Sequence, residues 1–169
     1  MIEYLSEKNK EYFVDTVYQH IGIVYKICNL YAKDGERDDL KQEIIYQLWK
    51  SFPSYKGTAK FQTWMYRVAL NTALLELRAK KIKYTELTEN EFNMQYESSD
   101  NYDKNKKIQL LYFHISKLDD LDKAITFLYL EQCTYNEIAE ITGINEKNVS
   151  VRLVRIKEKL KKMFNNKTK

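Results

Sequence analysis

The chain has 169 residues, of which 44% are hydrophobic and 31% are charged, and its formal net charge is +4. It contains only four glycines and one proline, and its apolar residues recur at spacings of three and four, so the sequence predicts an all-α fold of one medium or two small domains. No apolar run is long enough to span a membrane, and the N-terminal segment MIEYLSEKNK lacks the pattern of a secretory signal. These features predict a cytoplasmic protein without membrane insertion.

Positive charge is concentrated in two separate blocks. Residues 51–83 carry seven basic and one acidic side chain, and residues 141–169 carry nine basic and two acidic ones, whereas residues 84–140 carry five basic and twelve acidic ones. Basic blocks attract polyanions because each neutralised phosphate releases counterions. A solvated helix face would explain one such block, but two blocks that each coincide with a structural pattern favour nucleic-acid binding.

Three helices are expected in a first domain, residues 1–83. The apolar spacing between residues 13 and 31 predicts one amphipathic helix that ends near a turn at Gly35. A second helix is expected to begin at residue 38 or 39 and to end at the SFPSYKGT loop, where a proline and a glycine interrupt the pattern. A third is expected from about residue 60 to residue 81.

The third helix is expected to supply part of a core shared by all three. Phe61, Val68 and Leu75 recur at seven-residue spacing, which is typical of packed helices. Trp64 lies between them and has two possible roles, because an aromatic residue at helical spacing can belong to the core or can stack on an unpaired base.

A polar stretch without apolar periodicity, residues 84–107, predicts a flexible linker, although a short helix within it remains possible. The second domain is then expected over residues 108–169. Its first two helices should begin near Ile108 and Leu121, with Asp119 as the cap of the second.

The segment from Thr134 to Leu153 predicts two short helices joined by a tight turn. Thr134 and Glu137 have the spacing of a capping box, Gly143 suits a sharp reversal of the chain, and Asn145 can cap the following helix. In that helix the apolar stripe begins at Val149 and leaves basic and polar residues on other faces. An ordinary helical hairpin could show the same pattern, but the local positive charge favours a DNA-binding helix-turn-helix.

Three segments of the chain resemble, in their order and spacing, bacterial RNA polymerase sigma factors of the extracytoplasmic function group. These segments are DDLKQE (residues 38–43) followed by Trp49, YKGTAKFQTWMYRVALN (residues 55–71) and CTYNEIAEITGINEKNVSVRL (residues 133–153). The resemblance implies a region 2-like domain that binds core polymerase and opens the minus-ten element, and a region 4-like domain that reads the minus-thirty-five element. It implies no catalytic activity and no cofactor.

The resemblance also implies roles for individual residues. Contact with core polymerase would involve the acidic second helix, at Asp39, Leu40, Gln42, Glu43, Tyr46 and Trp49. Leu40, Leu48 and Trp49 could instead be core residues, and for Leu48 the core is the better explanation.

Recognition and opening of the minus-ten element would involve a loop and the helix after it. The loop would receive a flipped base, and the helix would follow the non-template strand. The residues are Tyr55, Lys56, Gly57, Thr58, Lys60, Thr63, Trp64, Arg67 and Asn71. The sequence departs from the family pattern at Thr58, which is often acidic, and at Leu70, which is often basic.

Recognition of the minus-thirty-five element would involve the leading end of the last long helix, which would enter the major groove. The residues are Glu146, Lys147, Asn148, Ser150, Val151, Arg152 and Arg155. Ser150 occupies a position where lysine is common in the family.

Two other classes of function were weighed. A one-component repressor could use the same helix-turn-helix without polymerase, but the acidic helix of the first domain argues against it. An enzyme has little support, because the chain has only two histidines, His20 and His114, and lacks a glycine-rich phosphate loop or a metal-ligand cluster. Core polymerase, duplex and single-stranded promoter DNA and an anti-sigma factor are the partners that the resemblance implies.

Overall fold

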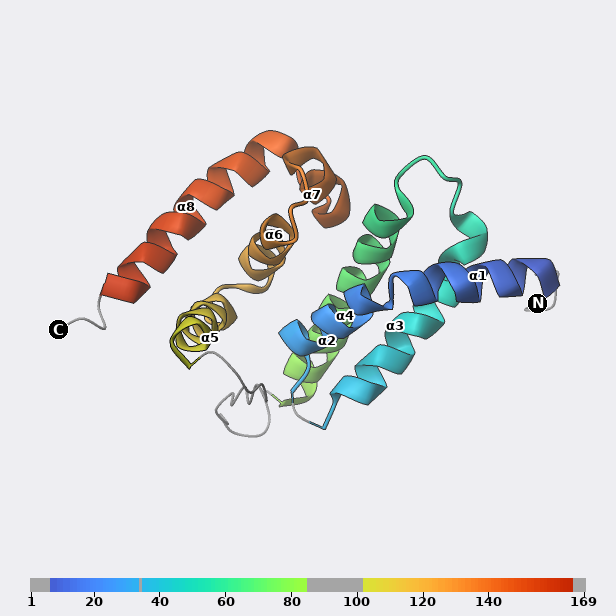
Figure 1. The fold of residues 1–169 in the computed structure, drawn as a ribbon, viewed down its shortest axis with the longest axis horizontal. Helices are drawn as coiled ribbons and strands as arrows, with labels where there is room; N and C mark the ends of the chain where they lie inside the picture. The colour runs from blue at the N-terminus through green and yellow to red at the C-terminus, as the bar shows by residue number, and fades with distance from the viewer. Residues whose placement is uncertain (1–6, 34, 85–101, 166–169) are drawn as a thin grey trace. The chain divides into compact units, whose positions relative to one another are not determined.

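The computed structural model describes residues 7–33, 35–84 and 102–165. These residues form eight α-helices and one short 3-10 helix, with no β-strand among them (Figure 1), which confirms the predicted all-α class. The chain divides into two compact units, Met1–Phe92 and Asn93–Lys169. Within the described ranges, no helix is both long and apolar enough to cross a membrane.

The first unit contains the helices α1 (Glu7–Gln19), α2 (Ile21–Tyr31), α3 (Arg37–Ser51) and α4 (Phe61–Tyr84), and the 3-10 helix η1 (Phe52–Ser54). The long helix α4 packs against both α2 and α3. The core of the first unit contains fully buried apolar side chains from α2, α3 and α4, including Ile27, Ile44 and Met65. Leu48 is also fully buried, as its spacing predicted, and Cys28 is only 2% exposed.

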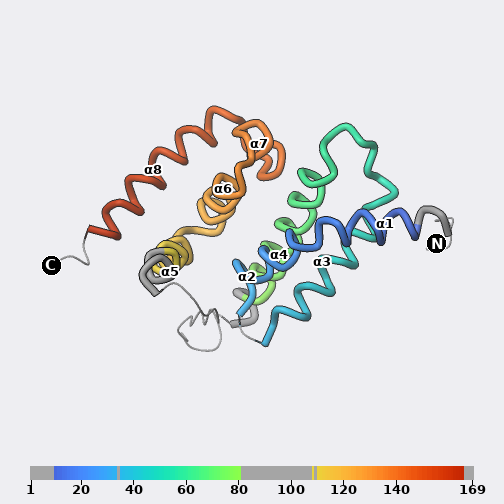
Figure 2. The backbone as a smooth tube through the Cα atoms, in the orientation of Figure 1, coloured from blue at the N-terminus to red at the C-terminus, as the bar shows by residue number. Residues whose placement is uncertain are grey.

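The prediction of one helix between residues 13 and 31 was wrong, because the chain breaks at His20 between α1 and α2 (Figure 2). His20 has φ −118° and ψ 14°, outside the helical range. Its N–H donates to the Val17 carbonyl three residues back, and its own carbonyl accepts from the Ile23 N–H. The stripe of buried apolar residues nevertheless continues across this break: Val24, Cys28 and Tyr31 are buried on α2, and only Ile21 is half-buried.

The expected core face of α4 was also misplaced. Leu75 is 63% exposed, and the fully buried positions are Met65, Ala69 and Ala73, at intervals of four residues. Because α4 packs against two helices at once, small alanine side chains on the contact face let the backbones approach closely. A seven-residue spacing alone does not identify this face.

The second unit contains α5 (Tyr102–Ser116), α6 (Asp120–Leu130), α7 (Tyr135–Thr142) and α8 (Glu146–Asn165). Helix α5 therefore begins inside the range predicted as linker, and residues 85–101 of that predicted linker lie outside the described residues. The stripe on α8 is buried at Val149, Leu153 and Ile156 and half-buried toward its end, where the Phe164 ring lies 4.6 Å from that of His114. Helix α8 thus packs against α5 as well as against α6 and α7.

Candidate polymerase and nucleic-acid interfaces

The loop before α4 is closed by one of its own side chains. The Tyr55 hydroxyl donates a 2.8 Å hydrogen bond to the Ala59 carbonyl, and Gly57 between them has a positive φ of 71°, a conformation that favours glycine. Lys56, Thr58 and Lys60 are exposed. The result is a short, constrained loop with cationic side chains and a bare backbone at its tip.

An aromatic cluster supports this loop. The Tyr55 ring lies 5.5 Å from Phe61 and 5.2 Å from Trp64, and Phe52 of η1 lies 6.2 Å from Trp64. Trp64 is only 5% exposed. Of its two possible roles, the structure therefore supports the core role, in which the indole anchors the loop to α4.

Thr63 was expected to share an accessible face of α4 with Lys60, Arg67 and Asn71, but the structure contradicts this. Thr63 is 5% exposed, in a run of buried residues at the start of the helix, whereas Lys60 and Asn71 are exposed and Arg67 is half-buried. The 3-10 helix and the loop add packing partners at this end of α4, so its buried face is broader than the helical period predicts. Thr63 and Trp64 are therefore removed from the strand-facing surface.

An apolar groove lies between α1 and α3. From α3 it is lined by Gln42, Tyr46 and Trp49, and from α1 by Phe13 and Val14. The rings of Phe13 and Trp49 meet edge to face at 4.9 Å, while Tyr46 is 49% exposed. Accessible aromatic residues of this kind are enriched in protein interfaces. The contribution of α1 was not predicted from the sequence: Phe13 is a buried residue at the base of the groove, and Val14 is exposed beside it.

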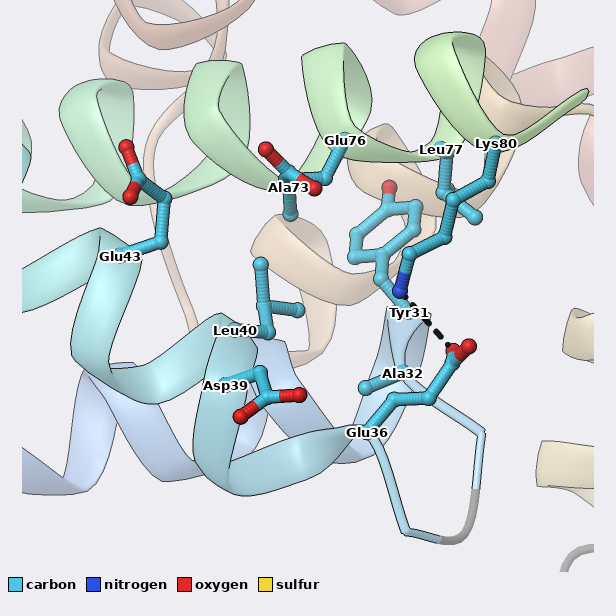
Figure 3. Close-up of a pocket in the computed structure, with 10 residues that line it drawn as sticks. All are labelled: Tyr31, Ala32, Glu36, Asp39, Leu40, Glu43, Ala73, Glu76, Leu77 and Lys80. Carbon is cyan, nitrogen blue, oxygen red and sulfur yellow. Dashed lines mark ion pairs between the residues drawn. The ribbon is translucent and has the colours of Figure 1, made fainter. Parts of the chain in front are cut away.

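The remaining predicted polymerase residues line a different pocket, between α3 and α4. Figure 3 shows Asp39, Leu40 and Glu43 on the α3 side of this pocket. At its edge, the Lys80 ammonium of α4 lies 3.1 Å from the Glu36 carboxylate. The six residues predicted to contact polymerase therefore belong to two surfaces rather than one.

The structure corrects the assignment of Leu40. Its side chain is 7% exposed and forms a buried ridge with Ile44 and Leu48, at four-residue intervals along α3. This ridge packs in the core with α2 and α4. Leu40 therefore packs mainly in the core and holds α3 in place, with only a small part of its side chain at the pocket between α3 and α4.

The helix-turn-helix predicted in the second unit is present and is capped as expected. Thr134 and Glu137 form a reciprocal capping box at the start of α7, an arrangement that stabilises a helix by about 1 kcal/mol. Gly143 ends α7 in the left-handed conformation, with φ 75°. The Asn145 side chain then accepts the Asn148 N–H at 2.8 Å, which caps α8.

The residues predicted to read the minus-thirty-five element lie on the first three turns of α8. Glu146, Lys147, Asn148, Val151 and Arg155 are exposed, and Ser150 is half-buried. Arg152 differs from the others, because its Nη1 atom lies 2.6 Å from the Asp122 carboxylate of α6. Sequence analysis missed this ion pair, which joins residues far apart in the chain.

Sequence profiles of two families match the two units separately. The profile of Sigma-70 region 2 matches residues 16–82, and that of Sigma-70 region 4 matches residues 115–160. The ECF RNA polymerase sigma-E factor of Haemophilus influenzae is 26% identical over 175 residues, covering 94% of this chain and 90% of that protein. That of Escherichia coli K12 is 24% identical over 170 residues, covering 94% and 89%. The chain belongs to the extracytoplasmic function sigma factors.

Two solved structures share the fold of this chain. The sigma factor RpoE, in complex with the anti-sigma factor NepR from Bartonella quintana, matches with a TM-score of 0.76 and 14% identity, over 90% of this chain and 96% of that one. CnrH, in complex with the cytosolic domain of CnrY, matches with a TM-score of 0.65 and 17% identity, over 94% and 90%. As a sigma factor, the chain acts in transcription initiation. The family matches therefore favour this function over that of a repressor that works without polymerase.

Proposed function

We propose that this sigma factor uses three surfaces: the groove between α1 and α3 for core polymerase, the loop before α4 for the minus-ten element, and the leading end of α8 for the minus-thirty-five element. One observation carries the proposal. Two constrained, exposed basic surfaces belong to two separate units, and each is built from the motif that the family resemblance assigns to one promoter element. The protein has no catalytic activity of its own and works in the cytoplasm.

Core polymerase binds the open side of α3. The accessible residues on this side are Gln42, Tyr46 and Trp49, with Asp39 exposed at the start of the helix. A groove with an aromatic base and a polar margin has the anatomy of a protein interface. The half-buried Glu43 faces the pocket between α3 and α4.

Opening of the minus-ten element uses the loop and the accessible side of α4. Gly57 and Thr58 leave room for an unstacked base to approach the backbone, and cationic groups hold the phosphates of the separated strand. The Tyr55 ring supports the loop by packing against Phe61 and Trp64. The strand-contacting residues are Lys56, Gly57, Thr58, Lys60, Arg67 and Asn71.

Recognition of the minus-thirty-five element uses α8. Lys147, Asn148 and Val151 reach base edges and adjacent phosphates in the major groove, and the exposed Val151 can contact a thymine methyl group. Glu146, Ser150, Arg152 and Arg155 complete the contacts. The two units form the two functional domains, with all of α5 (Tyr102–Ser116) in the second one, and each domain contacts a separate promoter element.

An anti-sigma factor regulates this protein. The support comes from the two structural matches: the sigma factor RpoE is in complex with the anti-sigma factor NepR, and CnrH is in complex with the cytosolic domain of CnrY. A protein that binds this chain and also inhibits the transcription that the chain directs would be the anti-sigma factor. Capture without inhibition would contradict the regulatory role.

The decisive experiment is run-off transcription with purified bacterial core polymerase, with and without this protein. Templates come from a randomised promoter library, so no promoter sequence is assumed. We expect promoter-specific transcripts only when the protein is present. If the protein neither associates with core polymerase nor directs transcription, the proposed function is wrong, even if it binds DNA.

A further inference from the structure

Arg152 is tied to a neighbouring helix. Its Nη1 atom lies 2.6 Å from Oδ1 of Asp122 on α6, and the exposed fractions of the two side chains are 39% and 16%. The adjacent α8 residues Lys147, Asn148 and Val151 are exposed. The direction of the Arg152 guanidinium is therefore set by the fold before any ligand binds.

Asp122 is itself firmly held. Its backbone N–H donates a 2.9 Å hydrogen bond to the Asp119 carboxylate, which caps α6. Its carbonyl accepts a 2.6 Å hydrogen bond from the Thr126 hydroxyl one turn later. The carboxylate therefore projects from a capped, hydrogen-bonded first turn, and it is a fixed point rather than a mobile surface charge.

The ion pair leaves Arg152 able to bind a further partner. A guanidinium has five N–H donors in a planar fork, and the short contact with Asp122 engages one of its two terminal nitrogens. The side chain remains 39% exposed. A fork held at one end can present its other donors to a guanine edge or to a phosphate, because both accept paired hydrogen bonds.

We propose that Asp122 is a positioning residue for promoter recognition, which holds the Arg152 guanidinium in the orientation that reads the minus-thirty-five element. This inference rests on the proposed function of α8. An arginine fixed in advance loses less conformational freedom when it binds DNA, so Asp122 strengthens binding of the correct sequence although it does not touch the DNA.

The proposal predicts a change in DNA affinity of the opposite sign from the change that simple electrostatics predicts. Removing a carboxylate near DNA normally tightens binding, because a negative charge that repels phosphate is lost. A positioning role predicts that Asp122→Ala weakens binding of the preferred sequence. Glu158→Ala removes the same charge from an exposed position on α8 and is the matched control.

The test uses the full chain in complex with core polymerase. The preferred upstream duplex is first selected from a randomised pool by the wild-type complex, and its affinity is compared with that of a scrambled duplex. We expect Asp122→Ala to reduce the ratio of the two affinities by about five- to tenfold. We expect Glu158→Ala to leave the ratio unchanged.

Two further variants separate positioning from general stability. Asp122→Asn preserves the shape of the side chain and should give an intermediate loss. The double variant Asp122→Ala plus Arg152→Ala should be no less selective than Arg152→Ala alone, because positioning has no effect once the positioned group is absent. Thermal unfolding of each variant checks that the second unit remains folded.

The proposal is overturned if Asp122→Ala tightens binding, if it changes both duplexes equally, or if its effect adds in full to that of Arg152→Ala. These results leave the sigma-factor function intact, because wild-type selection and transcription would still be observed. If the wild-type complex selects no sequence and directs no transcription, both the proposed function and this inference fail.

Discussion

The Tyr55 hydroxyl donates to the carbonyl of Ala59 within the same loop, at 2.8 Å. This hydrogen bond fixes the span of backbone that we assign to the flipped base. Tyr55→Phe keeps the ring on its aromatic neighbours but loses the bond, which is worth about 1 kcal/mol. We expect roughly fivefold weaker strand opening, measured by permanganate reactivity. Binding of intact duplex should not change, and equal opening by the variant would show that the bond does not organise the loop.

The cationic groups of the same loop should contribute more to the binding of separated strands than to the binding of duplex DNA. We expect the double variant Lys56→Ala plus Lys60→Ala to lose strand opening while keeping most of its duplex affinity, because the loop binds the unpaired strand. Permanganate footprinting and fluorescence anisotropy measure the two effects. Lys26→Ala plus Lys33→Ala removes the same charge from other exposed positions of the first unit and is the control. Similar losses in both double variants would indicate a general charge effect.

Tyr46 and Tyr25, which are exposed to almost the same extent, offer a matched test of the polymerase surface. They are 49% and 50% exposed, but Tyr46 lines the groove with α1 whereas Tyr25 lies on α2 beneath the Lys41 ammonium. We expect Tyr46→Ala to weaken binding of core polymerase by about tenfold, a typical loss for an aromatic residue at an interface. Tyr25→Ala should bind normally. If only the Tyr25 variant is impaired, polymerase binds another face.

The Asp119 cap makes the stability of α6 depend on pH. Burial raises the pKa of Asp119, but the hydrogen bond from the Asp122 backbone N–H and the nearby Arg152 and Lys159 outweigh it and hold the pKa of this carboxyl below its ordinary value. A carboxyl whose pKa is lower in the folded state stabilises the protein above the unfolded pKa, and this contribution is lost as the pH falls through the folded pKa.

Asp119→Ala should therefore destabilise α6 by about 1 kcal/mol at pH 7, as expected for the loss of an N-cap. The difference from wild type should shrink below pH 4. Amide hydrogen exchange of α6 measures both, since protection reports local opening. A difference that stays constant down to pH 2 would show that the charge of the cap is irrelevant.

Gly143 and Gly22 should respond in opposite ways to alanine. A Cβ atom at either position would meet no atom within 4 Å, but only Gly143 has a positive φ, of 75°. Gly143→Ala should destabilise the second unit by about 1–2 kcal/mol through backbone strain. Gly22→Ala, inside α2, should stabilise the first unit by about 0.5–1 kcal/mol. Thermal unfolding tests both, and a neutral Gly143 variant would mean that the turn relaxes at little cost.

Local chemistry explains which features could be predicted from the sequence. The capping box at Thr134, the turn at Gly143 and the cap at Asn145 each depend on residues within a few positions of one another. Such short-range patterns retain their meaning in any fold. The sequence alone therefore predicts the helix-turn-helix.

Features created by tertiary packing could not be predicted in this way. Trp64 is buried because Phe52 and Tyr55 cover it, and the sequence does not show that the chain folds back over α4. The pair between Asp122 and Arg152 joins residues 30 positions apart. At His20 the helix breaks without a proline, so the apolar pattern continues across the break and conceals it.

The burial of Cys28 bears on how this protein can receive an oxidative stimulus. Desolvation raises the pKa of its thiol to about 11, although Lys41 and Arg37 oppose the shift. At neutral pH the thiol therefore stays protonated, whereas the thiolate is the form that attacks peroxides and disulfides. Cys28 is therefore a weak nucleophile in the folded protein, and an oxidant would react more readily with a more accessible group.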